Sequence, residues 1–260
     1  MKKTLIALAV AASAVVSSSA MAWTQNGSGG SIGLGGTLTP TVKATPWEVY
    51  VGSAVADLNS AVQIGQQSVD VPVNKPIPIL GIRLQQKAAV LGSRLKGNVP
   101  QINYGGKLDL NSFQDGTGTV TLDVLDKNSS SKIGTVTVPL FAAGLSSWKG
   151  GNGPQQKYLV AERAGQAFFG GLPKNSNSAR DHAAGSLAKL NPEFGANYVS
   201  QDGSLTGMGG EDFTYDKDTY SAYYGSGIEQ NKLIKIKLDS PASTNAIAWK
   251  ASMPVVVTYK

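Results

Sequence analysis

Cysteine is absent from this chain of 260 residues, and histidine occurs once, as His182. Without thiols the protein has no disulfide, no cysteine nucleophile and no zinc–thiolate site. A single histidine excludes a cluster of histidine ligands around a metal ion and leaves His182 as the one candidate for histidine catalysis. The fold must therefore be stabilised by core packing or by a partner.

Charge is also scarce, because charged residues make up 15% of the chain and the net charge is +6. The positive residues are not gathered in one block, so the sequence predicts no nucleic-acid-binding protein. Glycine, in contrast, is abundant, with 31 residues. A high glycine content favours β-rich structure with many turns over a helical bundle.

Residues 1–22 have the pattern of a secretory signal peptide. Lysines at positions 2 and 3 precede an apolar run over residues 5–16, and Ala20-Met21-Ala22 provides a small-residue cleavage site. The apolar run is short for a membrane span and has no stop-transfer flank, which argues against a membrane anchor. The sequence thus predicts an exported protein that begins at Trp23 after cleavage.

Short runs of alternating apolar and polar residues fill most of the remaining chain. Each run has one apolar face, which is typical of half-buried antiparallel strands. Turn sequences separate the runs at Gly105-Gly106, at Asp115-Gly116 and over residues 126–131. This spacing predicts a β-sandwich or barrel. The expected strands cover residues 47–51, 69–73, 107–111, 119–124, 136–140 and 234–238.

Residues 142–218 differ and predict a partly helical insert in an otherwise all-β chain. The first expected helix covers residues 155–172, where apolar residues recur at helical spacing. The second covers residues 178–190, with Ser178 as its cap and Pro192 as its end. An insert of this length is usually functional or a subdomain of its own.

The two ends of the exported chain have complementary patterns. From Trp249 to the last residue, apolar and polar residues alternate, which predicts one unbroken amphipathic strand with Pro254 at a sheet edge or bulge. No later strand would cover this strand, and an uncovered apolar edge is an aggregation hazard. At the other end lies a glycine-rich extension, residues 23–40. Alternate residues of this extension share one side of an extended chain: Ile32, Leu34, Gly36 and Leu38.

These two ends fit β-strand addition between molecules, in which backbone hydrogen bonds join an extended segment to an open sheet edge. The N-terminal segment of one molecule would complete the sheet of the next. Such a head-to-tail interface grows a filament. The same pattern also fits a chain that inserts the segment into its own sheet, because alternation does not identify which chain supplies the partner.

Three blocks carry a resemblance to a known family: IGLGGTLTP at 32–40, YSAYYGSGIEQNKLIKIKL at 220–238 and WKASMPVVVTYK at 249–260. Together with the absence of cysteine, they resemble the major subunit-adhesins of enterotoxigenic enteric fimbriae, which a chaperone and an usher assemble. The resemblance implies that residues 41–260 form an incomplete immunoglobulin-like sandwich, completed by donor-strand exchange. It also implies a structural protein with no enzymatic activity and no cofactor.

The resemblance further implies roles for particular residues. Ile32, Leu34, Gly36 and Leu38 would be donor positions, and Val255, Val257 and Tyr259 would line the acceptor groove. The penultimate Tyr259 fits the family pattern, whereas Ile247 stands where such subunits often have a glycine. The implied partners are identical subunits bound head to tail, a periplasmic chaperone, an outer-membrane usher and a host glycoprotein or glycolipid. The implied route leads through the periplasm to a cell-surface fimbria.

The resemblance also implies that glycan recognition lies in the insert. Trp148 lies in LSSWKGGNGP, which is predicted as an exposed loop. An aromatic ring stacks on the apolar face of a pyranose while nearby polar groups reach its hydroxyls. Trp148 packing the insert onto the sandwich is the alternative, because large aromatic residues are usually mostly buried. The candidate sugar-binding residues are Trp148, Lys149, Asn152 and Tyr158, the last of which would open the first helix.

Neither a catalytic site nor a metal site is predicted. Asp181 cannot orient His182, because adjacent residues on a helix do not face one another. Four acidic residues lack calcium-loop spacing and are expected to form a solvated turn: Glu211, Asp212, Asp216 and Asp218. Two alternatives to the polymerised subunit stay open. One is a self-complemented secreted lectin or minor fimbrial subunit, and the other is a hydrolase with a carboxylate pair, for which no spacing motif exists.

Overall fold

The computed structural model describes residues 33–39 and 44–260. The chain divides into two units, residues 1–42 and 43–260. In the first unit, residues 33–39 belong to no helix or strand, and Leu34 and Leu38 are 95% and 96% exposed. Ile32, the first predicted donor residue, lies outside the described residues.

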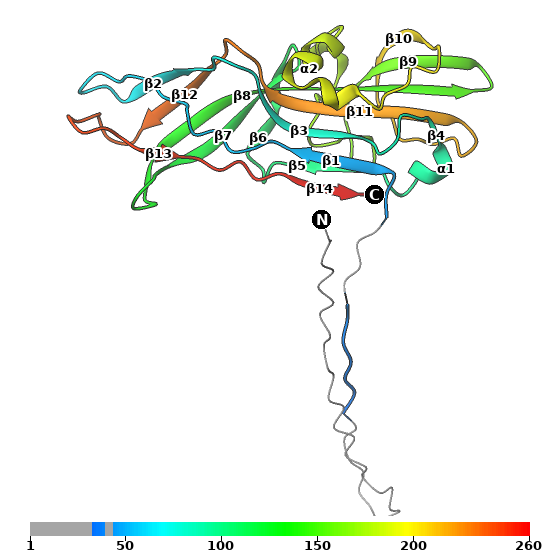
Figure 1. Cartoon of the computed structure of the whole chain (residues 1–260), viewed down its shortest axis with the longest axis horizontal. Helices are drawn as coiled ribbons and strands as arrows, with labels where there is room; N and C mark the ends of the chain where they lie inside the picture. Colours follow the sequence, from blue (N-terminus) through cyan, green and yellow to red (C-terminus); the bar gives the residue numbers. More distant parts are fainter. Residues whose placement is uncertain (1–32, 40–43) are drawn as a thin grey trace, which may run out of the picture. The chain divides into compact units, whose positions relative to one another are not determined.

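The second unit is mostly β-structure, as predicted, and its strands form one large and one small sheet (Figure 1). Neighbouring strands along the main path of the large sheet are antiparallel. Its order is β1 (Trp47–Val51), β3 (Ile77–Leu84), β11 (Thr219–Ile228), β8 (Lys132–Gly150), β12 (Leu233–Leu238) and β2 (Ser68–Pro72).

Further strands pair with the edge of β8 that lies opposite β11 and β12. β7 (Thr117–Asp126) pairs with β8, β6 (Leu108–Gln114) and β13 (Trp249–Lys250), whereas β9 (Gly153–Leu159) pairs with β8 and β10 (Ser204–Gly209). β4 (Val90–Leu91) pairs with β11. The small sheet consists of β5 (Pro100–Asn103) and β14 (Val256–Tyr259). The helices are short: α1 (Gly92–Leu95), η1 (Ser176–Ser178), α2 (Ala184–Leu190) and η2 (Pro192–Gly195).

The alternating runs become strands whose apolar faces meet in one main core. In β7, for example, Val120 and Val124 are fully buried while Asp123 between them is exposed. The predicted turn at Asp115-Gly116 joins β6 to β7, and both residues have positive φ, 46° and 69°. A two-residue hairpin loop needs this conformation, which Asp-Gly adopts readily. A smaller second core lies under α2, around Tyr158, Leu187 and Phe194.

The helix predicted over residues 155–172 is wrong. Residues 153–159 form β9, and the chain then continues without a regular helix to residue 172. Pairing with β8 and β10 satisfies the backbone of β9, and this pairing outweighs the helical spacing of a few apolar residues. The second predicted helix exists over the shorter range of α2, and its N-terminal flanking residue is Ala183, because Ser178 lies in η1.

Two further expectations need correction. Trp148 belongs to β8 rather than to an exposed loop, because LSSWKGGNGP forms the hairpin between β8 and β9. The C-terminal strand is also interrupted: residues 251–255 between β13 and β14 have no strand pairing, although their burial still alternates. Pro254, which has no N–H to donate, lies in this interruption. Over the described parts of the chain, no helix is long and apolar enough to span a membrane.

Candidate functional site

The inward face of the C-terminal segment is incompletely buried. Every second side chain along residues 249–259 packs against the main core, yet all of them remain partly exposed. The corresponding apolar residues of β7 and β12 are buried. The six partly exposed residues are Trp249, Ala251, Met253, Val255, Val257 and Tyr259. This part of the core therefore lacks cover within residues 44–260.

β14, which contains the last residues of this row, and β1 have one strand partner each among the described residues. β14 pairs with β5, and β1 pairs with β3. The segment after β1, residues 52–63, contains no strand, and its Leu58 and Val62 are further partly buried residues on the main core. Both strands thus have a side where backbone N–H and C=O groups can accept another strand.

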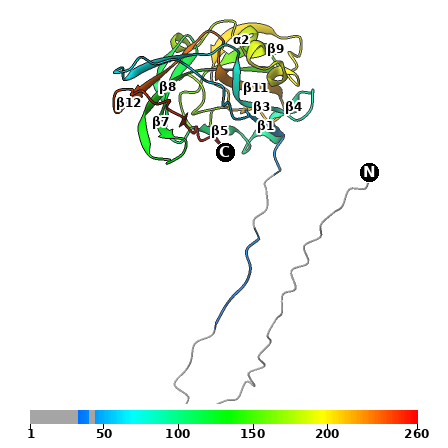
Figure 2. The same ribbon diagram turned by 60° about the vertical axis from the view of Figure 1, so that its left-hand side comes forward.

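β1 and β14 meet at one corner of the domain, where both views place the C-terminus close to β1 (Figure 1; Figure 2). The indole N–H of Trp47, at the start of β1, donates to the carbonyl oxygen of Asn98 at 2.7 Å. The next residue, Val99, exchanges two backbone hydrogen bonds with Lys260, of 2.8 and 3.1 Å. The first residue of β1 and the last residue of β14 therefore both lie at this corner. We call residues 47–62 together with residues 249–259 the C-terminal seam.

The C-terminal seam and the N-terminal extension can be compared in length and spacing. At about 3.3 Å per residue, residues 251–259 span about 30 Å and a segment of the length of 32–38 about 23 Å. The predicted acceptor residues Val255, Val257 and Tyr259 all lie on the partly exposed inward face. Leu34, Gly36 and Leu38, the described members of the predicted donor set, are exposed. They are spaced by two residues, and the inward residues of the seam have the same spacing.

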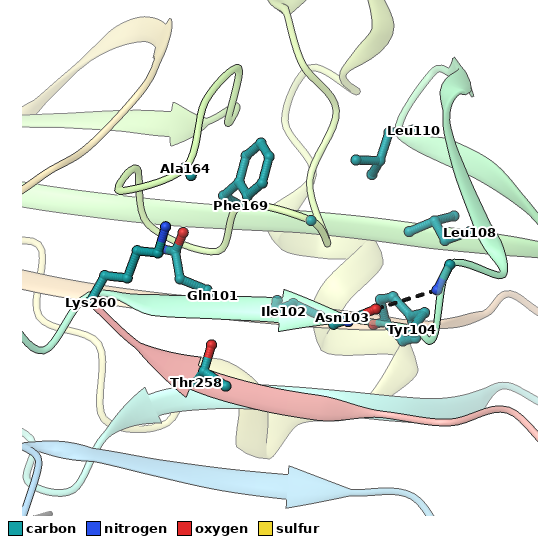
Figure 3. A pocket seen from close by; sticks show the side chains of 12 residues that line it. Gln101, Ile102, Asn103, Tyr104, Leu108, Leu110, Ala164, Phe169, Thr258 and Lys260 are labelled. Atoms are coloured by element: carbon teal, nitrogen blue, oxygen red, sulfur yellow. Dashed lines mark hydrogen bonds between the residues drawn. The ribbon is translucent and has the colours of Figure 1, made fainter.

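A pocket of about 360 Å³ lies on the other face of β14 (Figure 3). Thr258 and Lys260, which alternate with the inward residues, form one side, and Leu108, Leu110 and Phe169 contribute apolar walls. Gln101 also lines it, but its amide is used within the fold, donating to Gln166 O and accepting from Gly165 N–H, both at 3.0 Å. No sequence pattern predicts this pocket, because four separate segments form it.

A second pocket, of about 260 Å³, contains Trp148. The ammonium of Lys157 lies 4.8 Å from the centroid of the Trp148 ring and 3.3 Å from the carboxylate of Glu211. Glu211 is only 6% exposed and also accepts hydrogen bonds from the Ser146 hydroxyl and the Phe213 amide. The expectation that Glu211 lies in a solvated turn is therefore wrong, because a lysine on β9 compensates its buried charge.

The mouth of this pocket combines aromatic and polar groups. Tyr215 is 68% exposed, and its backbone N–H donates to the hydroxyl of Tyr220. Burial raises the pKa of Tyr220 to about 12, so its hydroxyl is neutral at physiological pH. Asp212 is exposed and accepts a hydrogen bond from the Thr214 hydroxyl. Its carboxylate lies 3.5 Å from the guanidinium of Arg163. The pocket thus combines aromatic, cationic and acidic side chains in its lining.

The four predicted sugar-binding residues do not all gather here. Trp148 lines the pocket, and Lys149 and Asn152 are exposed at the nearby β8–β9 hairpin. Tyr158 pairs with Leu145 on the opposite face of the hairpin, where it is buried. Lys157, Asp212 and Tyr215 line the pocket without having been predicted from the sequence. The alternation of β9, once known, places Lys157 on the same face as Trp148.

The histidine and the acidic candidates are not arranged as a metal site in the described structure. Within residues 33–39 and 44–260, no three His, Asp or Glu residues are arranged to hold a metal ion. His182 is exposed in a turn with φ of 53°, and its ring faces Tyr158 edge-on with centroids 6.4 Å apart. Asp216 forms an exposed ion pair with Lys96 at 3.3 Å.

Comparisons with known proteins match the whole chain. Residues 1–260 fit the model of a family described as "Fimbrial, major and minor subunit". The chain is 30% identical to K88 fimbrial protein AC, 31% to K88 fimbrial protein AD and 28% to F41 fimbrial protein, all of Escherichia coli. Each of these similarities covers 100% of both chains.

Proposed function

The chain belongs to the family of major and minor fimbrial subunits, and we propose that it polymerises by donor-strand complementation at the C-terminal seam. Its relatives are structural components of cell-surface fimbriae. The observation that carries the proposal is the row of inward residues over 249–259, which contacts the core but stays partly exposed beside the single-partnered strand β14. A strand from a neighbouring subunit would cover this row.

The N-terminal extension has the chemistry that the seam requires. Leu34 and Leu38 are almost fully exposed, and each would gain about 1.5–3 kcal/mol on full burial. Ile32 would add a third apolar side chain. Gly36 would allow the donor backbone to approach the floor of the seam closely. Backbone hydrogen bonds to β14 would fix the donor segment in place.

In this proposal the domain is an immunoglobulin-like sandwich that lacks its final strand. A periplasmic chaperone would fill the seam first, with contacts to Val255, Val257 and Tyr259, and an outer-membrane usher would exchange it for the next subunit. An exposed apolar row of this length would aggregate if it were left open, which supports the need for a temporary partner. Export through the periplasm follows from the predicted signal peptide, residues 1–22.

Deletion of residues 23–38 tests the proposal, since it removes the donor segment and leaves the seam. We expect the variant to form no filament and to stay soluble only with a chaperone or with a synthetic peptide of residues 30–40. The control is the same peptide with Leu34→Asp and Leu38→Asp, which should not rescue. Efficient filament formation by the deletion variant refutes the proposal.

Self-complementation is the competing proposal, because the alternating pattern of the extension does not identify which chain supplies the strand. A chain that fills its own seam would be a secreted lectin or a minor subunit that caps rather than extends a filament. Size measurement after refolding separates the two. A stable monomer without added peptide supports self-complementation, and head-to-tail oligomers support exchange.

We also propose that the subunit binds host glycoconjugates at the Trp148 pocket. Support comes from the combination of Trp148, the exposed ring of Tyr215 and the exposed carboxylate of Asp212 around a space of monosaccharide size. Lys149 and Asn152 at the hairpin could extend contacts to a second sugar. Trp148→Ala should abolish glycan-array binding by assembled fimbriae. Tyr158→Phe, on the opposite face, is the matched control and should bind normally.

A further inference from the structure

We propose that the insert, residues 142–218, clamps edge strand β1 in the position that a donor strand requires, with Arg83 as the central positioning residue. This inference rests on the proposed donor-strand function, but the clamp itself can be tested separately. The contacts that carry it come from both faces of β1.

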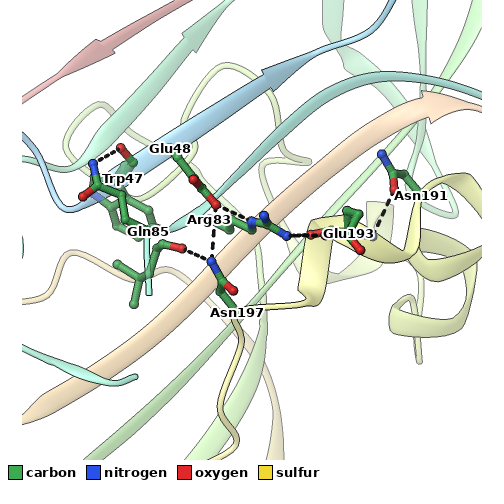
Figure 4. Close-up of polar contacts among 8 residues, drawn as sticks. Trp47, Glu48, Arg83, Gln85, Asn191, Glu193 and Asn197 are labelled. Carbon is green, nitrogen blue, oxygen red and sulfur yellow. Dashed lines mark hydrogen bonds and ion pairs between the residues drawn. The ribbon is translucent and has the colours of Figure 1, made fainter. Parts of the chain in front are cut away.

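The outer face of β1 is held by a polar network (Figure 4). Arg83 of β3 donates through Nε to the carboxylate of Glu48 on β1 at 2.6 Å. Its Nη1 donates to the backbone carbonyl of Glu193 in η2 and to the Glu193 carboxylate, the latter at 3.1 Å. The Asn197 amide donates to the same Glu48 oxygen at 3.3 Å and to the carbonyl of Leu84 at 2.8 Å. Arg83 thus joins β1, β3 and the insert.

An apolar contact reinforces the outer face. Phe194 of η2 is buried against β3 and β11, where a Cβ at Gly81 or Gly225 would overlap its ring. The ring of Tyr50 on β1 lies edge-on to Phe194, with centroids 5.8 Å apart. The two glycines therefore let η2 approach the sheet closely enough to reach β1.

The inner face of β1 is held by the same insert. Trp47 is buried, and its ring contacts Phe168 and Phe213, at centroid distances of 5.8 and 5.9 Å. Both phenylalanines belong to the insert and have positive φ, 62° and 54°. Such a conformation is unfavourable for a bulky residue and persists only where surrounding packing enforces it. The insert thus contacts β1 from two sides.

This arrangement matters because β1 has a single strand partner in the described structure. A strand with one hydrogen-bonded neighbour opens more easily than a central strand. If the insert holds β1 in place, a donor strand meets an edge that is already ordered, and less conformational entropy is lost on binding. Ion pairs as exposed as Arg83–Glu193 contribute little to stability, so the network should affect the order of β1 more than overall unfolding.

The test compares Arg83→Met and Arg83→Lys with Lys132→Met in the full chain. Lys132→Met removes the exposed ion pair between Lys132 and Asp123, of 2.6 Å, on strands that do not pair with β1. For each variant, the rate at which chaperone-bound subunit captures a peptide of residues 30–40 is measured. Hydrogen exchange measures the protection of the backbone amides of residues 48–51. Thermal unfolding of the peptide-filled form reports overall stability.

We expect Arg83→Met to slow peptide capture by about tenfold. A change of this size corresponds to the coupling energy typical of residues within one hydrogen-bond network. Protection of amides 48–51 should fall in parallel, Arg83→Lys should restore part of both effects, and Lys132→Met should change neither. If Arg83→Met fails to fold, Glu193→Gln, which leaves the Arg83–Glu48 pair intact, should give a smaller loss in both measurements.

Unchanged protection of amides 48–51 in the folded Arg83 variants overturns the clamp, whatever happens to capture. The clamp is equally overturned if Lys132→Met alters capture as much as Arg83→Met does. Failure of the unaltered subunit to capture the peptide would instead refute donor-strand complementation. In that case the hydrogen-exchange measurement still decides whether the insert orders β1.

Discussion

Val257 lies directly opposite Ile102 in the pair of strands β14 and β5, yet the two side chains differ in burial. Ile102 is 5% exposed, whereas Val257 is only partly buried, although both pack against the main core. β5 is flanked by Phe169 on the side away from β14, through a parallel bridge at Gln101 and a hydrogen bond from the Ile102 amide. The difference places the uncovered side of the core beside β14.

Substitutions on the two faces of β14 should have different effects on fimbrial stability. Val257→Ser removes an inward side chain that a donor strand would cover, and we expect it to weaken each subunit contact by up to about 1.5–3 kcal/mol. Val256→Ser, on the outward face where the side chain is 51% exposed, is the matched control and should have little effect. The temperature at which purified fimbriae dissociate into monomers measures both. Equal shifts for the two variants would contradict the assignment of faces.

Gly36 and Gly35 provide a second matched pair, because they lie on opposite sides of an extended donor segment. Gly36→Leu should block polymerisation, since a large side chain would collide with the floor of the seam. Gly35→Leu should polymerise, since its side chain would point away. Neither glycine has a φ in the left-handed region, so backbone strain does not confuse the comparison. Filament yield by electron microscopy decides, and a normal yield for Gly36→Leu contradicts the donor register.

Lys157→Met should destabilise the subunit, because it leaves the buried carboxylate of Glu211 without its cation. Removal of one partner from a buried pair costs about 3–5 kcal/mol, and the partial exposure of Lys157 places the expected loss at the low end. Lys157→Met combined with Glu211→Gln should recover much of the loss. Chemical denaturation of peptide-filled subunit measures both variants. No recovery in the double variant would show that Lys157 acts through packing on Trp148.

Alkaline pH should destabilise the fold through its buried tyrosines. Burial raises the pKa of Tyr104 to about 12, and its hydroxyl is hydrogen-bonded to Tyr224 and Ser226, at 3.0 and 2.8 Å. An unfolded tyrosine has a pKa of about 10. The folded state therefore retains the proton longer, so this stabilisation is complete below pH 10 and is lost as pH rises toward 12.

Ultraviolet titration of tyrosinate checks this expectation. Burial also raises the pKa of Tyr198 to about 12, so at pH 11 the native protein should show distinctly less tyrosinate than the denatured protein. The difference should vanish near the pH of unfolding. Identical titration curves for native and denatured protein would contradict the burial of these side chains.

The strands were predictable where local chemistry and pairing agree. The alternation of β7 and β12 and the Asp-Gly hairpin between β6 and β7 identify half-buried antiparallel strands, and the structure confirms them. Residues 155–159 were not predictable, because their composition fits a helix or a strand. Pairing with β8 across the hairpin and with β10, which lies much later in the chain, decides between the two. Propensity is a weak guide in such a segment.

The candidate sites show the same division. The inward positions of Val255, Val257 and Tyr259 follow from alternation alone. That β14 has β5 as its one strand partner within the described residues depends instead on which separate segments meet. The burial of Glu211 depends on Lys157, and the separation of Tyr158 from Trp148 depends on the face of a hairpin that was predicted as loop and helix. Which residues share a face could be predicted, but which segments meet could not.

Disulfide cross-linking between two chains tests the source of the donor strand most directly. Because the chain has no native cysteine, only the introduced cysteines can form the disulfide. One tagged chain carries Val257→Cys, and a second chain with a different tag carries a cysteine at position 32, 34, 36 or 38. Disulfides require Cα atoms within about 7 Å, so bonding reports direct apposition. Fimbriae assembled from both chains should contain disulfide-linked dimers carrying both tags at one or two donor positions. A double variant that instead closes the disulfide within single monomers, with no mixed dimer at any position, would contradict assembly by donor-strand exchange.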